Sequence, residues 1–147
     1  MRWDVLRYEV AADPLARSYS SMTDDQVAAS LNAKDRVMVE QTFVTAKDLM
    51  ARMDPSVAAT ILQKLEAEAA NNPVVKWIMS FITGGGEGID LGHANTRAQI
   101  DALVAAGVLT ATEGASLKAL AERTVSRAEE LGLPEIKPWM VAHVRGS

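Results

Sequence analysis

Residues 54–83 read DPSVAATILQKLEAEAANNPVVKWIMSFIT, and this stretch decides the fold class. Asp54-Pro55 and Asn72-Pro73 are two helix-start signals, because a capping side chain precedes a proline at the first helical position. After Pro55, apolar residues recur at spacings of three and four, which places them on one face of a helix. That stripe consists of Ala58, Ile61, Leu62, Leu65 and Ala69. The pattern predicts two consecutive helices.

The second of these helices, predicted over residues 73–83, is apolar nearly all the way round. Its apolar residues are Val74, Val75, Trp77, Ile78, Met79, Phe81 and Ile82. A helix without a polar face is typically buried on most sides. We therefore expect it to be the central core helix, or a core element that also reaches a partner subunit.

Helix signals continue along the rest of the chain, whereas alternating strand patterns are nearly absent. Capping boxes, in which Ser or Thr is followed three residues later by Gln or Glu, predict further helix starts. They are Thr23 with Gln26, Thr110 with Glu113, and Ser126 with Glu129; additional helices are expected over 2–11, from Thr42 or Thr45, and after Asn95 as cap. Only residues 34–41 fit an extended segment. The expected class is all-α, a compact bundle of about six to seven short helices.

The same signals predict one domain, because neither side of the glycine-rich stretch holds a comfortable core alone. We expect the tail to dock on its own domain or on a neighbour, since it carries a tryptophan. The expected organisation over residues 1–147 is N-terminal helices at 1–83, a glycine-rich loop and candidate hinge at 84–94, a helical hairpin plus short helix at 95–132, and a docked tail at 133–147.

Composition removes several kinds of chemistry. The chain has no cysteine and two histidines, so thiolate metal sites, disulfides and cysteine nucleophiles are excluded and a histidine-built metal site nearly so. The net charge is −4 and no two basic residues are adjacent, which disfavours binding to nucleic acid. The helix-turn-helix-like segment 96–123 is better explained as a packing hairpin. No cofactor and no metal is expected. No membrane contact is expected either, because no signal peptide or membrane span is recognisable.

The glycine-rich stretch contains the only candidate catalytic pair. Asp90 and His93 could act as an acid and a base, or His93 could simply bond within the loop. Residues 83–88 lack the Lys-Ser/Thr pair of a phosphate-binding loop, so they are better read as a flexible connection. No partner nucleophile is recognisable, and we expect no catalytic site.

Large apolar residues near the chain ends are the candidate partner contacts, because Trp is enriched in binding hot spots and Met lines adaptable surfaces. Trp3 and Trp139 either cap the core or reach a neighbouring subunit. The residues expected to contact a partner are Trp3, Tyr8, Tyr19, Trp139 and Met140.

Several short motifs carry a resemblance that spans most of the chain. They are Leu6-x-x-Glu9, Asp13-Pro14-Leu15-x-Arg17-x-Tyr19-x-x-Met22, Leu31-Asn32, Lys76-Trp77, Ile89-Asp90 and Ser126-Arg127-Ala128-Glu129-x-Leu131-Gly132-Leu133. In these the chain resembles small, mostly uncharacterised helical proteins encoded in the late structural gene region of tailed bacteriophages. That group usually has glycine where Ser18 stands here. The resemblance implies virion morphogenesis, in the tail rather than the head, and brings no catalytic residues.

Together these observations predict a non-enzymatic virion structural or assembly protein, and the resemblance implies that it is associated with the tail. It would act through contacts with other virion proteins in a homo- or hetero-oligomer, and its location would be the virion after synthesis in the host cytoplasm. The alternative is a small acidic phage-encoded regulator or inhibitor that binds a host protein in the cytoplasm.

Overall fold

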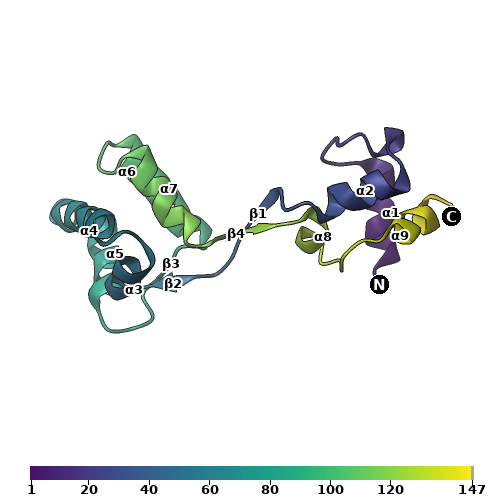
Figure 1. Cartoon of the computed structure of the whole chain (residues 1–147). Coiled ribbons are helices and arrows are strands. Elements are labelled where there is room, and N and C mark those ends of the chain that lie inside the picture. Colours follow the sequence, from purple (N-terminus) through teal and green to yellow (C-terminus); the bar gives the residue numbers. More distant parts are fainter. Residues whose placement is uncertain (147) are drawn as a thin grey trace. The chain divides into compact units, whose positions relative to one another are not determined.

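A computed structural model describes residues 1–146, and these are predominantly helical, as the sequence predicts (Figure 1). Two short two-stranded sheets, β1 with β4 and β2 with β3, were not expected beyond the extended segment in which β1 lies. The elements are α1 (Trp3–Ala12), the 3-10 turn η1 (Tyr19–Ser21), α2 (Asp24–Asn32), β1 (Arg36–Val39), β2 (Phe43–Val44), α3 (Ala46–Arg52), α4 (Pro55–Ala69), α5 (Pro73–Thr83), β3 (Ile89–Asp90), α6 (Ala94–Ala105), α7 (Ala111–Ala119), β4 (Glu122–Val125), α8 (Arg127–Glu130) and α9 (Pro138–Arg145).

The described chain forms two compact units, where the sequence predicts one domain with a hinge at residues 84–94. Unit 1 consists of Met1–Met38 together with the chain from Thr124 onward, and unit 2 is Val39–Arg123. The chain passes between them within β1 and β4, and the glycine-rich stretch lies inside unit 2. Helical periodicity reports neighbours three or four residues apart. It therefore carries no signal that the two ends of the chain share a core.

Unit 1 has its own hydrophobic core, to which both ends of the chain contribute. The tail docks in this unit, because α9 packs against α1 and α2 and buries Val141 and Val144. Asn32 ties the segment before α9 to α2, since its amide donates to the carbonyl of Ile136 at 2.8 Å and accepts from that residue's N–H at 2.9 Å. The buried members of this core are Leu6, Tyr19, Val27, Ala28, Leu31, Ala128, Leu133, Ile136, Val141 and Val144.

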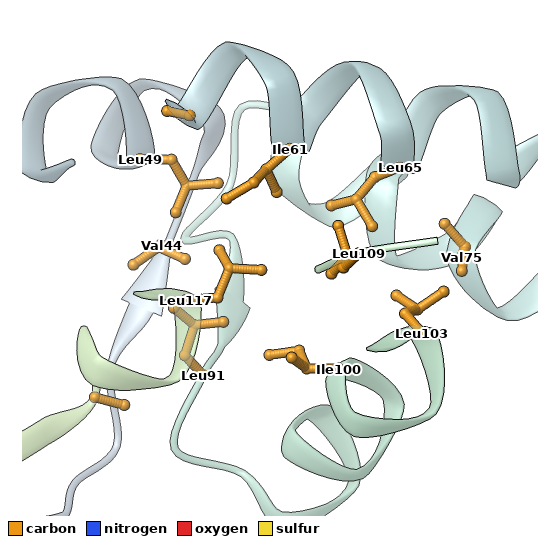
Figure 2. Close-up of a cluster of buried hydrophobic side chains, with 12 residues drawn as sticks. Val44, Leu49, Ile61, Leu65, Val75, Leu91, Ile100, Leu103, Leu109 and Leu117 are labelled. Atoms are coloured by element: carbon orange, nitrogen blue, oxygen red, sulfur yellow. The ribbon is translucent and has the colours of Figure 1, made fainter. Parts of the chain in front are cut away.

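Unit 2 is built on two pairs of packed helices, α4 with α5 and α6 with α7, around a second core (Figure 2). The β2–β3 pair is antiparallel and places Val44 opposite Ile89. Gly88 makes this pairing possible, because its φ is +98° and a Cβ there would lie 1.9 Å from the Val44 carbonyl oxygen. The buried core residues are Val44, Leu49, Ala58, Ile61, Leu65, Val75, Leu91, Ile100, Leu103, Leu109, Leu117 and Ala121.

Helix starts follow the capping signals closely. The three predicted capping boxes are present, and Thr45 with Asp48 forms a fourth at the start of α3. Asp54 and Asn72 cap α4 and α5 as predicted. The prediction of Asn95 as a cap is wrong by two residues: His93 is the cap of α6, because its ring nitrogen Nδ1 accepts the N–H of Asn95.

Candidate interaction surfaces

The most exposed apolar surface of unit 2 lies on α5, which corrects the prediction that this helix is buried on most sides. Only Val75 and Ile82 are buried. Val74, Trp77 and Phe81 are 47%, 65% and 57% exposed, respectively. Their spacing of three and four places them on one helical face. We call Val74, Trp77 and Phe81 the α5 face. The correction has a simple cause: α4 and β3 pack against one side of α5, and its apolar residues extend beyond that side.

A groove adjoins the α5 face, between α5 and α6. It has a volume of about 340 Å³ and carries no charged side chain. Its lining residues are Val74, Ile78, Ile89, Asn95, Thr96, Ala98 and Gln99. Four of them, Ile78, Ile89, Thr96 and Gln99, also line a small apolar cavity of about 30 Å³ in the core. The groove therefore leads from the α5 face towards the hydrophobic interior of unit 2.

A second aromatic surface lies on unit 1, where α1 and α9 pack together. The ring centroids of Trp3 and Trp139 are 5.9 Å apart, and those of Trp3 and His143 are 4.5 Å apart. Trp139 is 60% exposed, whereas Trp3 and Met140 are half-buried and pack against the core. Three predicted contact residues thus belong to one region, and Tyr8 is also exposed, on α1.

Tyr19, the fifth residue predicted to contact a partner, does not lie at the surface, because its side chain is wholly buried in unit 1. Its hydroxyl donates to Glu9 Oε2 at 3.2 Å. Burial, reinforced by the charge of Glu9, raises the pKa of Tyr19 to about 12, so the phenol remains a hydrogen-bond donor. A residue in this position completes the core and presents no surface to a partner.

Glu9 is the centre of a buried ionic network that the sequence analysis did not identify. The guanidinium of Arg127 binds both of its oxygens, Nη2 to Oε1 at 2.8 Å and Nε to Oε2 at 3.2 Å. The same guanidinium reaches Glu130 at 2.5 Å, and Arg36 binds Glu130 at 2.9 Å. The bonds to Glu9 raise the pKa of Arg127, while the Arg36 bond lowers that of Glu130. The sequence offers one sign of this network, because Glu9 and Arg127 both belong to the short motifs described in the sequence.

The turn after α1 explains another part of those motifs. The Asp13 carboxylate accepts the backbone N–H groups of Arg17, Ser18 and Tyr19, at 2.7, 2.8 and 3.3 Å. Arg17 in turn donates to the carbonyl of Ser30 at 2.8 Å. Ser18 has a φ of +66°, a left-handed conformation that glycine adopts freely. A glycine at this position would adopt the same conformation without strain.

Asp90 and His93 each bond to backbone groups. Asp90 Oδ1 accepts the N–H groups of Thr42 and Gly92, at 2.8 and 2.9 Å. His93 caps α6, so its Nδ1 acceptor is already occupied. These contacts explain both residues as parts of the local fold. Within residues 1–146 no three His, Asp or Glu side chains are grouped closely enough to hold a metal ion.

In comparisons with known proteins, no family model, curated protein or solved structure matches the chain. No helix in residues 1–146 combines the length and the apolar content that crossing a bilayer requires. The exposed surfaces and the short motifs are therefore the features that bear on function.

Proposed function

We propose that this chain is a non-enzymatic structural or assembly protein of a tailed bacteriophage virion, associated with the tail, and that it acts through protein–protein contacts. The observation that carries the proposal is the α5 face. Trp77 and Phe81 expose more than half of their side chains beside an uncharged groove, although both residues are of the kind that proteins normally bury.

The size of this exposure supports a binding role. Trp and Phe side chains each bury about 150–250 Å² when fully covered, so the two exposed rings present roughly 250 Å². At about 25 cal/mol per Å², covering them is worth at most about 6 kcal/mol before the costs of association. Contiguous apolar patches of a few hundred Å² on a monomer are often functional. A partner that covers this face would remove the unfavourable exposure.

The motifs supply the phage and tail assignment. Glu9, Asp13, Arg17, Tyr19 and Arg127 are motif residues, and every one makes a contact that holds unit 1 together. A motif that specifies a scaffold, rather than a constellation of reacting groups, is what an assembly protein would carry. The aromatic surface of Trp3 and Trp139 offers unit 1 a contact region of its own.

Quantitative mass spectrometry of purified particles of the encoding phage tests this proposal. We expect the chain at a fixed copy number that is a multiple of three, five, six or twelve, as rotational symmetry requires. Complete absence from particles would overturn the virion assignment and favour the cytoplasmic regulator.

A variant comparison tests the part assigned to α5. Particles produced with Trp77→Glu in place of the wild-type chain should contain at least tenfold fewer copies, because the charge would be buried in the contact. Val57→Glu is the matched control, since Val57 is also exposed but lies on α4. Equal incorporation of Trp77→Glu and the control would show that the α5 face is not the assembly contact.

A further inference from the structure

The two units are connected by two segments of chain, which run through β1 and β4 and pair with each other (Figure 1). Unit 2 is continuous in the sequence, from Val39 to Arg123, whereas unit 1 combines a segment before it with a segment after it. Each unit has a hydrophobic core built from its own residues. Unit 1 can therefore form only if the chain that contains unit 2 closes a loop.

The two ends of unit 2 are held together by bonds within unit 2 itself. The N–H of Glu40 donates to the carbonyl of Ala121 at 2.8 Å, and Arg123 Nε donates to Glu40 Oε1 at 2.9 Å. Arg97 of α6 also binds Glu122, the first residue of β4, at 2.6 Å. When unit 2 is folded, its ends are therefore as close as the two ends of a tight turn.

The bonds that hold unit 1 together join its two separate segments. Arg127 Nη2 binds Glu9 Oε1 at 2.8 Å, and the Asn32 amide donates to the carbonyl of Ile136 at 2.8 Å. Helix α9 packs against α1 and α2, which belong to the first segment. None of these contacts can form until the two segments have been brought together.

We infer that unit 1 depends on a folded unit 2 for its stability, whereas unit 2 folds without unit 1. The entropy cost of loop closure corresponds to the three-halves power of loop length. An unfolded unit 2 is a loop of about 85 residues, and a folded one behaves as a loop of about four. The ratio of these lengths, raised to that power, is about 100. Folding of unit 2 therefore favours unit 1 about 100-fold.

The coupling is reciprocal as a free energy, so a folded unit 1 favours unit 2 by the same factor. The two units still differ, because unit 2 has no long loop to close when it folds alone. The partly open state of this protein is thus one in which unit 1 is open and unit 2, with its α5 face, remains folded. This inference goes beyond the proposed function and does not depend on it.

Urea unfolding of the full chain tests the dependence of unit 1 on unit 2. Trp3 and Trp139 lie in unit 1, so fluorescence in a Trp77→Phe background reports on that unit. The double variant Ile61→Asp with Leu103→Asp should unfold unit 2, because it places two unpaired charges in its core. The folding equilibrium constant of unit 1 should then fall about 100-fold.

A matched control carries the same two charges at exposed positions. Val57→Asp with Ala102→Asp changes the same helices, α4 and α6, outside the core. Both units of this control should be as stable as in the parent chain. Hydrogen exchange followed by mass spectrometry shows in every sample whether residues 39–123 are folded.

A cross-link separates loop closure from every other effect of an unfolded unit 2. The chain has no cysteine, so Glu40→Cys and Arg123→Cys introduce two thiols that a short bis-maleimide can join. The native side chains at these positions bond to each other, so the reagent can span them. In the chain with the buried charges, the cross-link should restore the 100-fold loss, because it closes the loop covalently. The same chain with its thiols capped separately should show no recovery.

The converse variant tests whether unit 2 folds without unit 1. Val141 is wholly buried in unit 1, so Val141→Asp should unfold that unit. Residues 39–123 should keep their protection from hydrogen exchange in this variant.

Three outcomes would overturn the inference. Unit 1 could be equally stable in the chain with the buried charges and in its control, which would show that the units are not coupled. The cross-linked chain could fail to recover, which would show that the loss does not come from loop closure. Unit 2 could lose its protection in Val141→Asp, which would show that it needs a folded unit 1.

Discussion

Replacing Arg127 by Met should destabilise unit 1 severely, because it removes the charge partner of a buried carboxylate. The Glu9 side chain is 1% exposed and that of Arg127 is 13% exposed. Glu130 would keep its bond to Arg36, whereas Glu9 would lose both bonds to Arg127 and keep the bond from the neutral hydroxyl of Tyr19. Breaking one side of a buried ion pair costs about 3–5 kcal/mol. Against a typical total stability of about 5–15 kcal/mol, that loss is large.

Urea unfolding of the wild-type chain and variants, followed by the fluorescence of Trp3 and Trp139, measures this loss in the unit where it occurs. The background should carry Trp77→Phe, so that both remaining tryptophans report on unit 1. Lys137→Met is the matched control: its ion pair with Glu135 is exposed, and such pairs contribute about 0–1 kcal/mol.

The double variant Glu9→Gln with Arg127→Met separates the lost pair from the lost packing. Once the buried charge is gone, the penalty of leaving it unpaired disappears, so the double variant should be more stable than the sum of the single losses predicts, by about 2 kcal/mol. The reasoning would be refuted if Arg127→Met lost less than about 1 kcal/mol. Strict additivity would refute it equally.

Three further predictions concern local geometry and pH. Ser18→Gly should stabilise unit 1 by about 0.5 kcal/mol in urea unfolding, because it relieves a left-handed residue at some entropic cost, and a lower midpoint would contradict this. Gly88→Ala should lower the free energy of unfolding by about 3 kcal/mol, since its Cβ would strike the Val44 carbonyl; an unchanged thermal midpoint would count against that approach. The hydrogen bond from Lys64 lowers the pKa of Glu113, so the stability it contributes is present above its unfolded value of about 4.3 and is lost as pH falls through the lower folded value. Wild-type and Glu113→Gln midpoints should therefore converge below about pH 4, and a constant difference between them would exclude this linkage.

The local elements of this protein were largely predictable from short-range patterns. Capping boxes depend on residues three apart, and Thr23, Thr110 and Ser126 form them as predicted. Proline after Asp54 and Asn72 marked the starts of α4 and α5 for the same reason. Interactions of this kind are decided within one helical turn, so sequence spacing is enough to find them.

The exposure of individual side chains was predicted less well, because composition does not show which other elements pack against a given residue. The all-round apolar pattern of α5 indicated burial, yet Trp77 and Phe81 remain exposed. Conversely, Tyr19 looked like a contact residue and is wholly buried against Glu9. Each error concerns a side chain whose environment is set by elements distant in the sequence.

The sequence alone determined that the chain is predominantly helical and where most helices begin, because propensity and capping act locally. Only the tertiary structure decided that Glu9 binds Arg127. It also decided that residues 39–123 form a separate unit, which is inserted in the sequence between the two segments of unit 1. No local pattern in the sequence marks where the chain closes a loop of this length. The entropy cost of closing the loop grows only slowly with its length, so burial anywhere along the chain can offset it. The α5 face emerged for the same reason, as the part of an apolar helix that the rest of unit 2 leaves uncovered.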